Sequence, residues 1–184
     1  MQSMLRSMFR GWRRIQTQLT LSVLLLFLAP FVFSAPVDSS APEVTLNVAN
    51  VGPRTMEPLT QRSVLRDYKF GWANLSEAFA NNSTGAMNGL FAGTANTWLN
   101  DAVQSQAHAG LTSRYLNQHH KVDAVFYAPE GDLIELHDTA EYDYQILYGS
   151  KTIHSEHAVV HYVVLMTPGA DRWVIRQLQS VQQF

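Results

Sequence analysis

The chain of 184 residues contains 13 basic and 15 acidic residues, seven histidines and no cysteine, which gives a formal net charge of −2. The absence of cysteine excludes a disulfide framework, thiolate chemistry and a cysteine-based zinc site. Residues 35–184 hold nine of the basic residues and all 15 acids, a net charge of −6. This balance argues against nucleic acid as a partner, because phosphate binding needs clustered lysine and arginine.

The first 37 residues have the layout of an export segment. Four arginines precede an apolar run over residues 19–33, and small residues follow at Ser34 and Ala35. This order is typical of a signal peptide, here cleaved before Ala35, or of an N-terminal membrane anchor. As an anchor, residues 19–37 are near the lower limit of the ~17–25 residues that span a bilayer. In either case we expect the rest of the chain to be periplasmic, extracellular or membrane-anchored, facing away from the cytoplasm.

Three segments follow from these patterns. Residues 1–34 are predicted to be the signal peptide or anchor, residues 35–56 a linker, and residues 57–184 one domain with its own core. The linker is inferred from three prolines and a polar run without a period. Residues 43–48 alternate between polar and apolar, however, and could instead form a short strand.

The predicted domain changes its hydrophobic period near His120. Before it, apolar residues at steps of one, three and four predict a helix over residues 57–80, flawed by Gly71, then a second helix up to Gly110 and a short third one over residues 111–116. After it, period-two alternation and turn residues predict about four hairpin-linked strands. The expected fold class is therefore α+β, with three N-terminal helices packed in a strongly curved antiparallel sheet. The expected core consists of Trp72, Leu75, Phe79, Leu90, Phe91, Trp98, Leu99, Tyr142, Ile146, Val164 and Trp173.

This order of elements resembles the NTF2-like superfamily, whose members form a cystatin-like α+β cone. The final strand, entered through Asp171-Arg172-Trp173-Val174-Ile175, and the segment Gly89-Leu90-Phe91-Ala92-Gly93 with Trp98-Leu99 behind it carry the resemblance. The second segment is similar to membrane-anchored, non-enzymatic members, which implies an assembly or scaffold module. The superfamily also contains isomerases, cyclases and hydratases, so its fold does not choose between these functions.

Asp138 is the candidate for acid–base chemistry. It shares the apolar face of its strand with Leu136 and Ala140, and Tyr142 and Tyr144 follow on the same face. An acid in a dry pocket beside phenols could transfer protons. The sequence then predicts a SnoaL-like small-molecule pocket with isomerase- or hydratase-type chemistry, in which Asp138 is the base and a tyrosine the donor. The alternatives are a bulge that turns Asp138 to solvent, and a buried acid with satisfied hydrogen bonds.

The opposite face of the same strand is acidic. Glu135, His137, Glu141 and Asp143 all point outward in the alternation. They could form a docking surface for a basic partner, the interface of a homodimer, or simply a solvated sheet face.

Three histidines, at positions 154, 157 and 161, suggest a metal site only at first sight. On a strand, His157 and His161 point to one side and His154 to the other. At ~3.3 Å per residue the two on one side are about 13 Å apart, too far to share an ion. We therefore expect no metal site.

Serine nucleophile elbows, phosphate loops and paired metal motifs do not occur in the sequence. We therefore expect an exported, non-catalytic binding or assembly module of the cell envelope that needs no cofactor. An envelope protein or a second copy is the expected partner, with the membrane contacted through residues 19–37 if they are not cleaved. The acid–base enzyme with a small-molecule ligand is the alternative.

Overall fold

The computed structural model describes residues 41–184, so the predicted signal or anchor segment lies outside the described residues. The elements are, in chain order, strands β1 (Glu43–Asn47) and β2 (Gly52–Pro53), helix α1 (Pro58–Asn81), the 3₁₀ turn η1 (Thr84–Met87), helix α2 (Gly93–His108), and strands β3 (Leu111–Tyr127), β4 (Ile134–Tyr148), β5 (Lys151–Pro168) and β6 (Trp173–Val181). Neither helix is both long and apolar enough to span a bilayer, as far as residues 41–184 are concerned.

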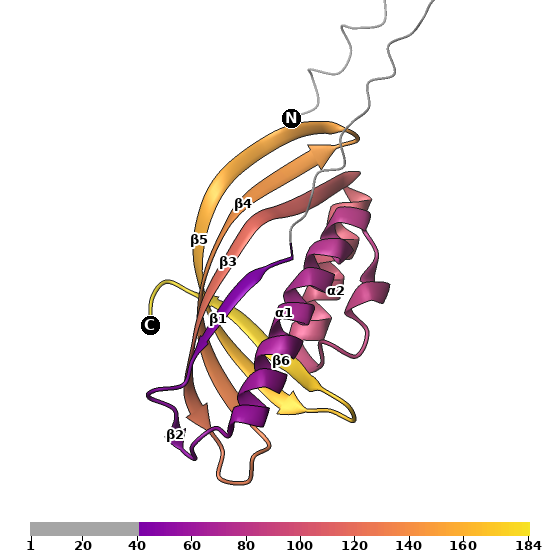
Figure 1. The fold of residues 1–184 in the computed structure, drawn as a ribbon. Coiled ribbons are helices and arrows are strands. Elements are labelled where there is room, and N and C mark those ends of the chain that lie inside the picture. Colours follow the sequence, from indigo (N-terminus) through magenta and orange to yellow (C-terminus); the bar gives the residue numbers. More distant parts are fainter. Residues whose placement is uncertain (1–40) are drawn as a thin grey trace, which may run out of the picture. The chain divides into compact units, whose positions relative to one another are not determined.

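All six strands belong to one mixed sheet. Its order is β1-β3-β4-β5-β6, with the short β2 also paired to β3. The strands β1 and β2 run parallel to β3, and the other neighbours are antiparallel. Figure 1 shows both helices on the concave side of the bent strands β3–β5, and no helix or strand of residues 41–184 lies on the other side. Antiparallel pairs tolerate such an exposed face.

The predicted architecture of three helices followed by about four strands is wrong. Between residues 41 and 184 the structure has two α-helices on a six-stranded mixed sheet, and two of the strands precede the helices. Residues 43–47 lie within the predicted linker and form strand β1. The polar–apolar alternation of residues 43–48 indicated this short strand as the alternative to a linker. The residues of β1 pair with residues 119–123 of β3, so this segment is part of the sheet.

The third predicted helix, over residues 111–116, is instead the first part of β3. A β-bulge hides this strand in the sequence. Asn117 has φ = +53°, and the register with β4 shifts between Leu116 and His119. The inward positions therefore change from odd numbers, such as Tyr115, to even numbers, such as His120, and the period-two pattern is interrupted.

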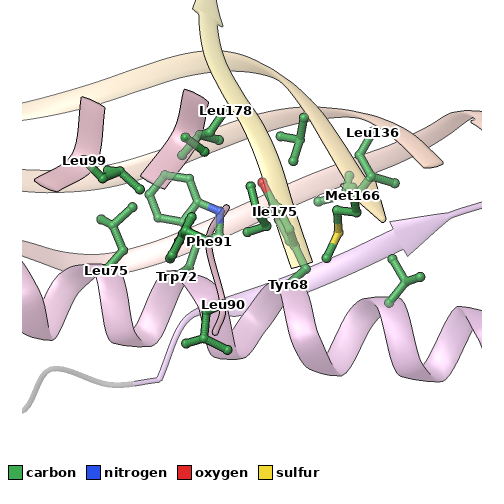
Figure 2. Packing of buried hydrophobic residues seen from close by; sticks show 14 of the residues in the cluster. Tyr68, Trp72, Leu75, Leu90, Phe91, Leu99, Leu136, Met166, Ile175 and Leu178 are labelled. Atoms are coloured by element: carbon green, nitrogen blue, oxygen red, sulfur yellow. The ribbon is translucent and has the colours of Figure 1, made fainter. Parts of the chain in front are cut away.

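The core lies between the helices and the concave face of the sheet. Figure 2 shows Tyr68, Trp72 and Leu75 of α1 facing strand residues such as Leu136, Met166 and Ile175. Eight of the eleven predicted core residues are buried, and Ile146 and Trp173 are half-buried.

The predicted burial of Trp98 is wrong. Its helix exists, but the side chain is 42% exposed. The inward stripe of α2 consists of Ala95, Leu99 and Val103, at steps of four, and Trp98 lies beside it.

Gly71 lets α1 approach β6 closely. A Cβ atom at this position would lie 2.9 Å from Ile175 Cδ1 and 3.7 Å from Phe91 Cζ. Glycine costs about 1 kcal/mol relative to alanine inside a helix. The apparent flaw in the helix pattern is therefore a packing requirement.

Candidate functional site

Asp138 is fully buried on the concave face of β4. Tyr68 Oη, from α1, donates to Asp138 Oδ2 over 2.6 Å, and His120 Nδ1, from β3, lies 2.7 Å from the same oxygen. The register pairs Asp138 with Val122 and Tyr162 without a bulge at this point. Asp138 is thus an inward-facing acid, hydrogen-bonded by side chains from a helix and a neighbouring strand.

Bulky side chains enclose the buried group of Asp138, Tyr68 and His120. The Trp72 ring centroid lies 4.5 Å from that of His120, and the exposed fractions of Trp72, Tyr68, His120 and Asp138 are all 2% or less. Asp138 Oδ1 and His120 Nε2 are buried without a hydrogen-bond partner within residues 41–184. The pair resembles a base with its orienting carboxylate in geometry. Neither unpaired atom, however, is exposed to solvent.

The tyrosines predicted to assist Asp138 bond elsewhere. Tyr142 Oη lies 3.1 Å from Tyr162 Oη, and Tyr144 Oη lies 3.0 Å from Ser113 Oγ. The structure therefore brings together Asp138, Tyr68 and His120, and not the predicted set.

The sequence indicated part of the arrangement of Asp138, Tyr68 and His120. His120 alternates with Val122 and Ala124, which marks it as inward-facing, and Tyr68 belongs to the apolar stripe of α1. Their convergence on one carboxylate depends on how α1 docks on β3, and no local pattern carries that information.

Several phenols on the concave side have raised pKa values. Burial is the main cause for Tyr68, Tyr115, Tyr142 and Tyr162. The negative charge of Asp138 raises the pKa of Tyr68 further. These phenols stay protonated at neutral pH, so they act as hydrogen-bond donors and as apolar surface.

An open hollow lies between α2 and the far end of the sheet. This Trp98 cleft has a volume of about 630 Å³ and is lined by Thr94, Trp98, Tyr115, Tyr162 and residues 177–180. The lining contains aromatic rings, amides and hydroxyls but no charged side chain. Such a surface suits an apolar or extended peptide ligand more than a charged metabolite.

The cleft follows an edge of the sheet. Strand β6 is last in the strand order, and Ile175 in its first half bonds to the backbone of Leu90 and Ala92. No strand found between residues 41 and 184 pairs with residues 177–181 on that side. This stretch has neither lysine nor proline, the residues that commonly protect an edge from strand addition.

The four residues of the predicted partner surface lie on the uncovered face of β4 and are only partly exposed. Histidines sit among the acids on this face. His137 Nε2 lies 3.1 Å from Glu135 Oε1, and His157 lies 3.3 Å from Glu141 Oε1 and 3.0 Å from Asp143 Oδ1.

The hydrogen bond with Asp143 raises the pKa of His157. Bonds from Asn117 and His157 lower the pKa of Asp143. The net charge of this face therefore depends on pH.

The three histidines of β5 have separate partners. His154 contacts Glu156, His157 contacts Glu141 and Asp143, and His161 bonds to Thr139. Within the part of the chain that the structure describes, no group of three or more side chains could hold a metal ion.

Comparison with known proteins adds a likeness in fold. No family model and no curated protein sequence matches the chain. Among solved structures, the intermembrane space region of chloroplast protein ARC6 matches with a TM-score of 0.51 and 14% sequence identity, over 70% of this chain and 98% of that one. This likeness shows a shared fold. The resemblance to the NTF2-like superfamily stays a prediction.

Proposed function

We propose that the chain is a non-catalytic binding module of the cell envelope, acting outside the cytoplasm, and that it holds a segment of a partner protein in the Trp98 cleft. One observation carries this proposal. The group that could perform acid–base chemistry is closed, whereas the cleft beside α2 is open and lined by residues suited to binding.

The closed group argues against the enzyme alternative. A general base must come within hydrogen-bond reach of the proton that it abstracts. Asp138 Oδ2 is already bonded to Tyr68 and His120, and the Trp72 ring packs against His120. All four side chains are buried, so a substrate would reach this group only if core side chains moved.

The cleft has the features of a peptide-binding site. Tryptophan is enriched among the residues that dominate binding energy, and Trp98 is a large exposed side chain at the rim. An extended partner segment would add to the free edge at residues 177–181 by main-chain hydrogen bonds. Its alternate side chains would reach Trp98 and Tyr115.

The location is supported by two observations. Residues 1–37 have the basic, apolar and small-residue order of an export segment. The fold is shared with a region of ARC6 that lies in an intermembrane space. A reporter that is active only after export, fused behind residue 60, should be active, and N-terminal sequencing of the mature protein distinguishes cleavage from anchoring.

Site-specific photo-crosslinking tests the binding site. Since the chain has no cysteine, a single cysteine can carry the crosslinker at Ser180 in the cleft, at Glu141 on the uncovered sheet face, or at Ser150 in the β4–β5 turn as control. In membranes of the producing cells, we expect a specific adduct from position 180 only. A synthetic peptide copied from the crosslinked partner should bind the full chain, and Trp98→Ala should weaken it by about tenfold or more.

The results of these experiments distinguish the cleft proposal from its alternatives. An adduct from position 141 would place the partner on the acidic sheet face instead, and the cleft proposal would be wrong. A peptide that binds equally well after Trp98→Ala would also contradict it. Catalytic turnover that disappears in Asp138→Asn would restore the enzyme alternative.

A further inference from the structure

The outer face of α1 carries a concentration of cations that is unusual in this acidic domain. At 3.6 residues per turn, the exposed or half-exposed positions 59, 62, 66, 69, 70 and 73 fall within an arc of about 100°. Arg172, from the β5–β6 turn, joins them, with its guanidinium 5.9 Å from the centroid of the Phe70 ring. Four of the nine cations of residues 35–184 thus lie on this α1 basic face, namely Arg62, Arg66, Lys69 and Arg172.

Two of these cations are not neutralised within the domain. Arg66 binds Asp67 over 2.7 Å and Arg172 binds Asp171 over 2.8 Å. The other two, Arg62 and Lys69, make no ion pair with any residue from 41 to 184. The face therefore has an excess of two positive charges.

Apolar surface accompanies this charge. Leu59 is 68% exposed and Phe70 48% exposed, and both lie on the same stripe of α1. A hollow of about 570 Å³ opens beside Phe70 and Ala73, between α1 and Arg172. Cations that flank exposed aromatic and aliphatic side chains on one helix face are typical of helices that lie on a membrane surface.

The covalent chain connects this face to the predicted anchor. Ala41 lines the same hollow, and only three residues separate it from Val37, where the predicted anchor segment over residues 19–37 ends. Four steps of at most ~3.6 Å give a reach of about 14 Å. If residues 19–37 anchor the chain in a bilayer, this short connection limits how far the hollow can lie from the lipid headgroups.

We propose that the α1 basic face rests on an anionic membrane surface, with the unpaired cations binding lipid phosphates and Phe70 and Leu59 entering the interface. This inference shares with the proposed function only the envelope location, and it uses no residue of the Trp98 cleft. A second copy that offers its acidic sheet face is the competing occupant.

Fluorescence quenching by lipid tests the proposal on the full chain. A single cysteine at Leu59 carries the dye, and one at the exposed Ser155, near the start of β5, is the control position. The chain is reconstituted in vesicles of phosphatidylcholine, with or without about one third phosphatidylglycerol, that contain a headgroup-labelled quencher. We expect quenching at position 59 but not at 155, only with the anionic lipid, and reversed by about 0.5 M salt.

Charge variants supply the matched control. Each cation near an anionic surface contributes a factor of about five, so Arg62→Gln with Lys69→Gln should reduce the ratio of docked to undocked domain by about 25-fold. Lys121→Gln with Lys151→Gln removes the same charge from other exposed positions and should leave that ratio unchanged. All four positions are exposed, and circular dichroism checks that the variants fold.

Three results would overturn the proposal. Equal quenching at positions 59 and 155, or quenching that ignores the anionic lipid, would show that α1 does not face the membrane. Loss of docking to the same extent in both double variants would show a general charge effect. A signal at position 59 that rises with protein concentration and is lost in Glu141→Lys would identify a second copy as the occupant. Failure of the peptide experiment leaves all these readings unaffected.

Discussion

His120 and Asp138 form a fully buried pair across strands β3 and β4, with Nδ1 and Oδ2 separated by 2.7 Å and both side chains 0% exposed. They are not direct cross-strand partners, because Asp138 pairs with Val122 and His120 with Ala140. The contact is therefore diagonal on the concave face, and Tyr68 of α1 completes it. A polar group of this kind fixes how the helix docks on the sheet, since a shifted helix would leave the buried Tyr68 hydroxyl without its partner and take one of two hydrogen bonds from Asp138 Oδ2.

Removing the helix partner tests this role. Tyr68→Phe keeps the ring but deletes the hydroxyl, so Asp138 Oδ2 loses one of its two hydrogen-bond partners in a dry site. We expect the free energy of unfolding to fall by about 1–3 kcal/mol. Urea denaturation measures it, with Tyr148→Phe as the control, because Tyr148 is 65% exposed and should change stability by less than about 0.5 kcal/mol. Equal stability of the two variants would show that the Tyr68 hydroxyl does not fix the docking of α1 on the sheet.

The inward position of Asp138 could be predicted from the sequence, and its partners could not. Alternation along β4 places Asp138 between Leu136 and Ala140 on the apolar face, as observed. Tyr68 lies 70 positions earlier in the chain. Only the docking of α1 brings it to the carboxylate, and periodicity describes one element at a time.

The errors in the predicted secondary structure have local causes as well. The left-handed Asn117 shifts the inward positions of β3, so that no continuous alternation marks its first part. Strand β1 has only five residues and pairs in parallel with a strand more than 70 positions away. The sequence did not predict the Trp98 cleft. Trp98 belongs to the apolar pattern of α2 and was therefore expected in the core, but in the structure its side chain is exposed.

Gly71 and Ile175 should be energetically coupled. Gly71→Ala adds a methyl group 2.9 Å from Ile175 Cδ1, so overpacking of about 1–3 kcal/mol outweighs the helix-propensity gain of about 1 kcal/mol. The substitution Ile175→Val removes that Cδ1 atom and costs about 0.5–1.5 kcal/mol by itself. We expect the double variant to be more stable than the sum of the single changes predicts, by about 1 kcal/mol. Strict additivity in urea denaturation would contradict the contact.

The neighbouring residues Trp98 and Leu99 on α2 should differ strongly in how much they contribute to stability and to binding. Leu99 is 0% exposed, and Leu99→Ala should lower the free energy of unfolding by about 2–5 kcal/mol. Trp98 is 42% exposed, and Trp98→Ala should cost less than about 1.5 kcal/mol while it weakens peptide binding in the cleft. Thermal or urea unfolding measures the first effect and titration with the peptide the second. A loss of stability at Trp98 as large as that at Leu99 would mean that Trp98 belongs to the core.

Four buried tyrosines should resist ionisation as the pH rises. Burial raises the pKa of Tyr68, Tyr115, Tyr142 and Tyr162, so these phenols stay protonated in the folded chain above their ordinary pKa of about 10. The unfolded chain releases those protons above pH 10 and the folded chain does not, so their contribution to stability is complete below that pH and is lost as the pH rises. Absorbance of the phenolate, followed together with circular dichroism, should show these four phenols ionising only as native structure disappears. Tyr162→Phe should reduce the amplitude of this ionisation and make the loss of stability with pH less steep. Reversible ionisation of these four phenols near pH 10, with native circular dichroism throughout, would show that the concave face is open to water.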